Sequence, residues 1–192
     1  SMPHWAGARP GDIIFEDYND DDIIDGNDRV RMDKSKNPTF PGGLNVDMAY
    51  KGFDLSILFQ GAAGGVFYQD TESGDFGNFL KSFYDKRWTE ENPTASYPRT
   101  YNRSNEYWVN QKNSFWVRKS DYIRLKNIEL GYTLPQTLTK RVNIEHVRFY
   151  VSAHNLLTYS PDMKDYDPEN TSERGYNHPL NKIVNLGLSV TF

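Results

Sequence analysis

Apolar and polar residues alternate with a period of two in five stretches of the chain, a pattern typical of β-strands. The first two stretches, 43–50 and 53–62, are separated by Lys51-Gly52, a length suited to a two-residue hairpin turn. The other three stretches cover 122–134, 146–157 and 182–192. One face of each stretch carries apolar side chains without a charge or an amide, and the opposite face is mostly polar. The sequence therefore predicts five antiparallel strands that share one uncharged face.

The third stretch changes phase near its middle. Ile128 and Leu130 alternate in one phase, whereas Ile123 and Leu125 occupy the opposite phase. One extra residue near Lys126 would bring both halves onto the same face, which is what a β-bulge does. The sequence thus predicts a bulge at this point, and a loop that ends there is the alternative.

Alternation by itself fits both a soluble β-sandwich with a buried core and a transmembrane barrel with a lipid-facing surface. The connections favour the barrel, because 51–52 is short, 135–145 is moderate, and 63–121 and 158–181 are long. An up-and-down barrel places short turns on one side and long loops on the other. Aromatic residues gather at the short-turn ends, as an interfacial girdle requires: Tyr50, Phe53, Tyr132, Phe149 and Phe192. Five strands cannot close a barrel, for which about eight are needed, so this interpretation requires further strands.

Composition supports the same interpretation without deciding it. Apolar residues make up 37% of the chain and aromatic residues 15%, with a mean hydropathy of -0.77. No run of about 18 apolar residues is present, which excludes a transmembrane helix. The net charge is -4 without a basic stripe, so no nucleic-acid partner is expected. The absence of cysteine excludes disulfides, thiolate zinc sites and a cysteine nucleophile.

An acidic stretch in the segment 3–42 follows the spacing of a calcium-binding loop. Oxygen-bearing side chains recur at loop positions 1, 3, 5, 9 and 12: Asp17, Asn19, Asp21, Asp25 and Asp28. Two departures weaken the match, because Asp22 replaces the usual turn glycine and Asp28 is shorter than the usual glutamate. The sequence predicts a Ca²⁺ site here, and a solvated acidic loop is the alternative.

The long connection 63–121 contains aromatic residues interleaved with arginines. Such side chains suit sugar rings or a protein partner, and six are candidates for partner or substrate contact: Trp88, Tyr97, Arg99, Tyr101, Arg103 and Trp108. A long loop that packs on its own aromatic core is the alternative. No nucleophile elbow, Walker A motif or GxGxxG motif is present, so no enzyme is expected and no catalytic residue is assigned.

Several blocks resemble, in fixed order, the SusC/RagA family of TonB-linked outer-membrane proteins. They are Pro10-Gly11-Asp12-Ile13, the acidic loop, 50–61, 87–93, Tyr97-Pro98-Arg99, 120–135, 150–158, Asp167-Pro168-Glu169 and the closing Phe192. The resemblance covers the chain from about Ala8 onward. The main departures are Asp22 in the acidic loop and His154, where the family often has Gln.

The resemblance implies the C-terminal part of a large antiparallel transmembrane β-barrel in a Gram-negative outer membrane. It implies import of an oligosaccharide or a peptide, together with a SusD-like surface lipoprotein as lid and with TonB acting through a missing N-terminal part. Phe192 would be the barrel-assembly signal, 3–42 an extracellular loop, and Ser1-Met2 a remnant of cloning. A soluble calcium-dependent β-sandwich that binds glycans is the alternative function.

Overall fold

The computed structural model describes residues 3–69, 79–102, 110–169, 178 and 180–192. The described residues form two compact units. The first lies within 3–34 and 68–117, and the second within 35–67, 118–169 and 178–192. Arg103, Trp108 and the Ser1-Met2 pair lie outside the described residues. No helix in the described part of the chain is long and apolar enough to cross a membrane.

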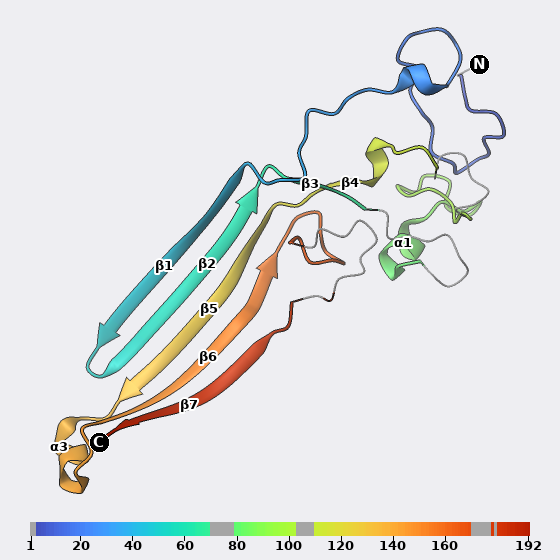
Figure 1. Cartoon of the computed structure of the whole chain (residues 1–192). Helices are drawn as coiled ribbons and strands as arrows, with labels where there is room; N and C mark the ends of the chain where they lie inside the picture. Colours follow the sequence, from blue (N-terminus) through green and yellow to red (C-terminus); the bar gives the residue numbers. More distant parts are fainter. Residues whose placement is uncertain (1–2, 70–78, 103–109, 170–177, 179) are drawn as a thin grey trace. The chain divides into compact units, whose positions relative to one another are not determined.

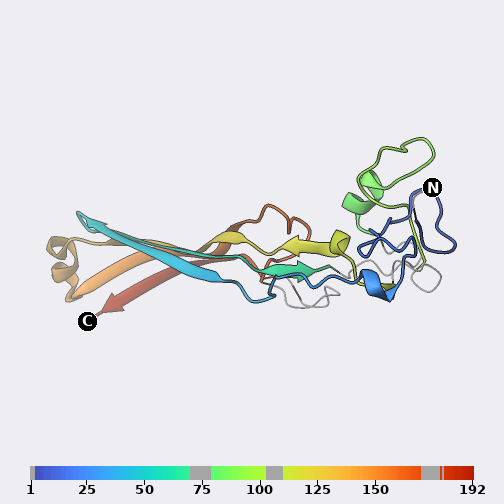
Figure 2. The same cartoon turned by 90° about the horizontal axis from the view of Figure 1, so that it is seen from above.

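The second unit is a five-stranded antiparallel sheet in the order β1-β2-β5-β6-β7. Its strands are β1 (Phe40–Tyr50), β2 (Phe53–Ala63), β5 (Tyr122–Thr133), β6 (His146–Tyr159) and β7 (Ile183–Thr191). Every hydrogen-bonded neighbour is antiparallel, and Figure 2 shows these strands as a single twisted layer. The predicted antiparallel fold class is therefore confirmed.

The connections differ at the two ends of this sheet. Lys51 and Gly52 both have positive φ angles, +47° and +86°, as a type I′ hairpin turn requires. The turn after β5 holds α3 (Gln136–Thr139) and the 3-10 helix η3 (Lys140–Val142), and it lies at the same end of the sheet as the β1–β2 turn (Figure 1). The long connections leave from the opposite end. This is the predicted alternation of short turns and long loops.

The register of the sheet shows the predicted bulge. Leu125 pairs with Phe59 and Leu157, and Asn127 pairs with Leu58 and His154, so Lys126 has no partner in the register on either side. β6 carries a matching irregularity at Asn155, whose φ is +52°. Because one inserted residue reverses the phase, Ile123 and Leu125 join the same face as Ile128 and Leu130.

The first unit contains little regular structure. It includes the 3-10 helix η1 (Gly26–Asp28), the six-residue helix α1 (Lys81–Lys86) and the 3-10 helix η2 (Ser114–Trp116). A short second sheet, most of whose residues belong to the second unit, pairs β3 (Val66–Tyr68) with β4 (Val117–Lys119), within the connection that the sequence analysis treated as an unbroken long loop. These short strands lack the length over which alternation could have indicated them.

Candidate ligand-facing cavity and acidic loop

The aromatic-rich part of the connection 63–121, called the aromatic segment below, builds its own core within the first unit. Phe83 is buried and its ring lies 4.9 Å from that of Phe79 and 6.2 Å from that of Trp116. Tyr101 is buried in the same cluster, edge-on to Phe79 at 5.3 Å. Stacked and edge-to-face pairs at these separations stabilise a core beyond the area that they bury. Tyr101, a candidate contact residue in the sequence, therefore lies inside this core rather than on its surface.

Two sequence blocks far apart in the chain pack together in this unit. Gly11 has a φ of +84°, and a Cβ atom built there would lie 2.5 Å from the ring of Trp88. The backbone N–H of Arg99 donates to the Gly11 carbonyl at 2.8 Å, and the Arg99 guanidinium pairs with Asp12 at 2.6 Å. The Asp12 side chain is 2% exposed. Arg99 thus holds the aromatic segment against the N-terminal segment.

A cavity of about 1230 Å³ lies within the first unit. Its aromatic lining residues are Trp5, Phe15, Tyr18, Tyr68, Trp88, Tyr97 and Phe115. Its polar lining residues include Asp25, Asp28, Arg29 and Gln111. The structure therefore brings two candidates from the aromatic segment, Trp88 and Tyr97, to the same cavity as two candidates from the acidic loop.

The acidic loop closes on itself through its own carboxylates. Asp28 accepts the backbone N–H groups of Tyr18 at 2.9 Å and Asp25 at 2.7 Å, and Asp17 accepts that of Asp22 at 2.8 Å. Asp22 has a φ of +63°. It takes the left-handed conformation that glycine supplies at this position of a calcium loop, so the departure in sequence leaves the turn in place.

The hydrogen bonds have an electrostatic consequence for Asp28. The N–H group of Asp25, followed by that of Tyr18, lowers the pKa of the Asp28 carboxyl below its ordinary value, since both bonds favour the charged form. This closure of the loop is complete above the ordinary carboxyl pKa and is lost as the pH falls through the lowered one.

The same carboxylates do not gather around one point. Among the described residues, no three His, Cys, Asp or Glu side chains lie close enough together to hold a metal ion. Asp17, Asn19 and Asp21 do not line the cavity. The Ca²⁺ site stays a prediction of the sequence.

The residues of the cavity that the sequence analysis did not single out include Tyr18, Arg29 and Gln111. Tyr18 is exposed and lies inside the acidic motif. The spacing of that motif indicates only the oxygen ligands and says nothing of the aromatic residue between them. Arg29 donates to Gln111 at 2.5 Å across 82 positions of sequence. No periodicity or motif links two residues at that separation, so only the structure could pair them.

Comparisons with known proteins place this geometry in a family. No protein-family model matches the chain. The chain is 32% identical to TonB-dependent receptor P3 of Formosa agariphila over an alignment of 181 positions, which covers 93% of this chain and 17% of the receptor. It is 31% identical to TonB-dependent receptor P26 of the same organism over an alignment of 209 positions, which covers 97% of this chain and 20% of the receptor.

The solved structure of the RagAB peptide transporter matches with a TM-score of 0.68 and 27% sequence identity, over 89% of this chain and 19% of the transporter chain. The chain spans about a fifth of the length of the curated relatives that it matches. The sheet and these relatives define a strand-rich segment of a membrane receptor. The chain belongs to the TonB-dependent receptors of the SusC/RagA type, which confirms the resemblance found in the sequence.

Proposed function

We propose that the chain supplies five neighbouring barrel strands, and part of the outer loops, of a TonB-dependent nutrient importer in the outer membrane. The observation that carries the proposal is the apolar face of the five-stranded sheet. One row of direct cross-strand neighbours runs Met48, Leu55, Leu130, Val151 and Leu186. Leu186 is 86% exposed. An uncharged face of this extent needs an apolar neighbour, and lipid supplies one along the whole face.

An aromatic row supports the same proposal. At the turn end of the sheet, direct cross-strand pairs join Tyr50 to Phe53, Phe53 to Tyr132, and Tyr132 to Phe149. The rings of Phe53 and Tyr132 lie 4.5 Å apart. Aromatic girdles of this kind occupy the boundary between lipid tails and headgroups in outer-membrane barrels.

A pair of matched substitutions in the full-length receptor tests the lipid-facing assignment. Leu186→Arg places a charge in the middle of the apolar face and is expected to cost about 2–4 kcal/mol. Asn185→Arg places the same charge on the polar face of the same strand and is expected to cost little. The readout is the amount of folded, heat-modifiable receptor in outer-membrane fractions. Normal levels of the Leu186→Arg receptor, or full recovery of the wild type in buffer without detergent, would favour a soluble sandwich instead.

We further propose that the importer takes up an oligosaccharide or a peptide and works with a SusD-like surface lipoprotein and with TonB. Aromatic faces beside Arg29 and Gln111 in the cavity suit either substrate class. Tyr18→Ala in the full-length receptor is expected to weaken substrate uptake with unchanged receptor levels. Tyr84→Ala removes an exposed aromatic that does not line the cavity, and it serves as the control. Competition between labelled oligosaccharides and peptides distinguishes the two substrate classes.

We also propose Ca²⁺ as an occupant of the acidic loop, on the strength of its spacing and the glycine-like turn at Asp22. Ca²⁺ binding would require the carboxylates of Asp17 and Asp21 to turn from backbone N–H groups toward the ion. A calcium titration of the receptor should release heat and raise its melting temperature, and Asp21→Ala should remove both effects. A titration without heat or thermal shift discards the site.

A further inference from the structure

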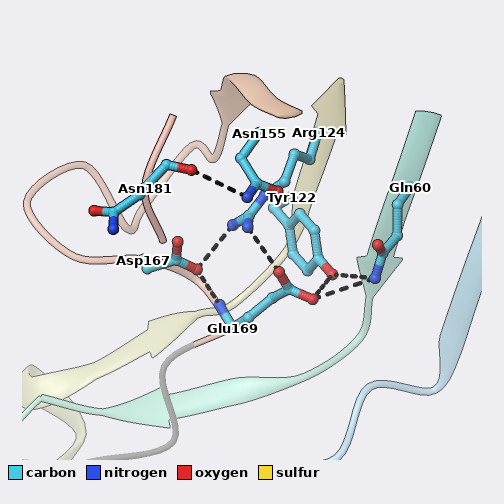
Figure 3. A network of polar contacts seen from close by, with 7 residues as sticks. All are labelled: Gln60, Tyr122, Arg124, Asn155, Asp167, Glu169 and Asn181. Atoms are coloured by element: carbon cyan, nitrogen blue, oxygen red, sulfur yellow. Dashed lines mark hydrogen bonds and ion pairs between the residues drawn. The ribbon is translucent and has the colours of Figure 1, made fainter. Parts of the chain in front are cut away.

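A buried arginine on the polar face of the second unit holds two carboxylates of the β6–β7 connection. Arg124 lies in β5 and is 1% exposed. Its guanidinium contacts Asp167 Oδ1 at 2.8 Å through Nη2 and Glu169 Oε2 at 2.8 Å through Nη1 (Figure 3). A buried guanidinium is tolerated only with paired acceptors, because removing its partners leaves an uncompensated charge away from water.

A tight turn in the connection holds the two carboxylates close together, so that both can bind a single guanidinium. The backbone N–H of Glu169 donates to Asp167 Oδ1 at 2.9 Å, which closes a tight turn around Pro168. Asp167 Oδ1 therefore accepts from its own turn and from Arg124. Because the turn and the proline restrict the backbone, little conformational entropy is lost when both carboxylates bind the same arginine.

Further bonds fasten the same segment to neighbouring strands. Glu169 Oε1 accepts the Tyr122 hydroxyl at 2.8 Å and the Gln60 side-chain amide of β2 at 3.2 Å (Figure 3). Upstream, Asp162 accepts the backbone N–H of Lys119 at 3.1 Å. The segment 162–169 is thus attached at both of its ends to the sheet and to its β4 neighbour.

The bulge in β5 allows Arg124 to reach these two carboxylates. If Lys126 were an ordinary paired residue of the strand instead of a bulge, regular alternation would place Arg124 on the same face as Ile128 and Leu130. The bulge turns Arg124 to the polar face and turns Leu125 to the apolar face. A bulge that re-aims one side chain is a common device beside functional sites.

We propose that Arg124 is a positioning residue for import: it anchors segment 162–169 against the polar face of the sheet and so fixes this part of the loop in the path of the substrate. The import role rests on the proposed function, in which the polar face lines the passage. The anchor itself does not depend on it. Release of the segment changes the substrate affinity of the receptor and leaves barrel assembly intact, since all five strands keep their register.

A cysteine reporter in the full-length receptor, freed of other accessible cysteines, tests the anchor. Met163 lies in the anchored segment and is 5% exposed, whereas its neighbour Lys164 is exposed. Met163→Cys should react slowly with a maleimide and Lys164→Cys quickly. Adding Arg124→Gln should raise the Met163→Cys labelling rate by about tenfold or more, toward that of Lys164→Cys. Glu169→Gln, which leaves every strand residue unchanged, should raise it by a smaller factor.

Arg148→Gln is the matched control. Arg148 also binds two carboxylates, Asp54 and Glu129, but all three residues lie in strands. Its loss should leave the labelling rate at Met163→Cys unchanged. An unchanged rate in the Arg124→Gln receptor, or an equal rise in the Arg148→Gln receptor, overturns the anchor.

Uptake kinetics test the positioning role separately. Arg124→Gln should raise the substrate concentration for half-maximal uptake several-fold at equal receptor levels, and Arg124→Lys, which keeps the charge, should restore part of the affinity. Faster labelling with unchanged uptake overturns the positioning role. A receptor that imports neither oligosaccharide nor peptide overturns the proposed function, while the labelling result still decides the anchor.

Discussion

Two arginine clusters on the polar face of the same sheet show how one kind of contact can serve two purposes. In the Arg148 cluster, the guanidinium joins Asp54 of β2 and Glu129 of β5 to β6, and its side chain is 28% exposed. In the Arg124 cluster, the guanidinium is fully covered and both carboxylates come from a connection. The first cluster ties strands that backbone hydrogen bonds already hold. The Arg124 cluster orders a segment, 162–169, that belongs to no strand and so has no ladder of backbone hydrogen bonds.

The two clusters also differ in what makes room for them. Arg148 lies over Gly131, and a Cβ atom there would collide with its guanidinium. Arg124 reaches the polar face only because of the bulge at Lys126. Regular alternation plus one glycine is sufficient for the Arg148 cluster, whereas the Arg124 cluster depends on an irregularity. The comparison therefore predicts different failures when each support is removed.

Exchange of the two side chains beside the bulge, Arg124→Leu with Leu125→Arg, should have the largest effect. Because the bulge turns position 125 to the apolar face, the exchange places an arginine on that face and removes the partner of Asp167 and Glu169. Loss of these ion pairs alone is expected to cost about 3–5 kcal/mol, and the exposure of an arginine to lipid adds to this cost. The folded, heat-modifiable receptor should fall to a small fraction of the wild-type amount, whereas Lys126→Ala, which keeps the bulge, should assemble normally. Normal assembly of the exchanged receptor would contradict the role given to the bulge.

Neutralising one carboxylate in each cluster should separate a buried contact from a partly exposed one. Asp167→Asn keeps an oxygen for the turn at Glu169 and removes the charge beside the covered guanidinium, with an expected cost of about 2–3 kcal/mol in local opening. Asp54→Asn should cost about 1 kcal/mol, since solvent screens the Arg148 cluster. Hydrogen exchange at the amides of 162–169 and of 129–131 measures both. Equal costs would mean that burial does not distinguish the clusters.

Two glycine substitutions should distinguish a rigid neighbour from a flexible one. A Cβ at Gly61 would lie 2.8 Å from the Tyr122 carbonyl, so Gly61→Ala must shift backbone beside the Arg124 cluster. At Gly131 the obstacle is the end of the Arg148 side chain, which can move away at the expense of its ion pairs. We expect about 2 kcal/mol for Gly61→Ala and about 1 kcal/mol for Gly131→Ala, measured by urea unfolding in lipid vesicles. A larger cost at Gly131 would reverse the ranking.

The sheet could be predicted from the sequence because its order is local. Alternation places every residue of a strand on one face or the other, so a phase change between Leu125 and Ile128 was enough to indicate the bulge. The turn at Lys51-Gly52 follows from its length and its glycine. These features need only neighbours within a few positions, and the structure contains all of them.

The contacts of the loops could not be predicted, because their partners are distant in sequence and have no period. Arg124 and Asp167 are 43 positions apart, and Asp12 and Arg99 lie in different blocks. The acidic motif was visible in the sequence, but its carboxylates bind their own backbone, which spacing alone does not reveal. Arg99 shows the same difficulty, because an arginine among aromatics is equally suited to a ligand and to a buried aspartate.

Added salt should produce the smallest difference between the two clusters, a difference in how far their ion-pair coupling energies fall. This difference is also the one that depends most directly on burial. The Debye length falls from about 10 Å at 0.1 M to about 3 Å at 1 M salt, and this screening acts on exposed charges more than on covered ones. The coupling of Arg148 to Glu129, measured by a double-mutant cycle from hydrogen exchange, should fall by about 0.5 kcal/mol over this range. The coupling of Arg124 to Glu169 should change little, because the guanidinium is shielded from the solvent. Equal salt sensitivity would indicate that water reaches Arg124, and would remove burial as the reason that this cluster orders a connection.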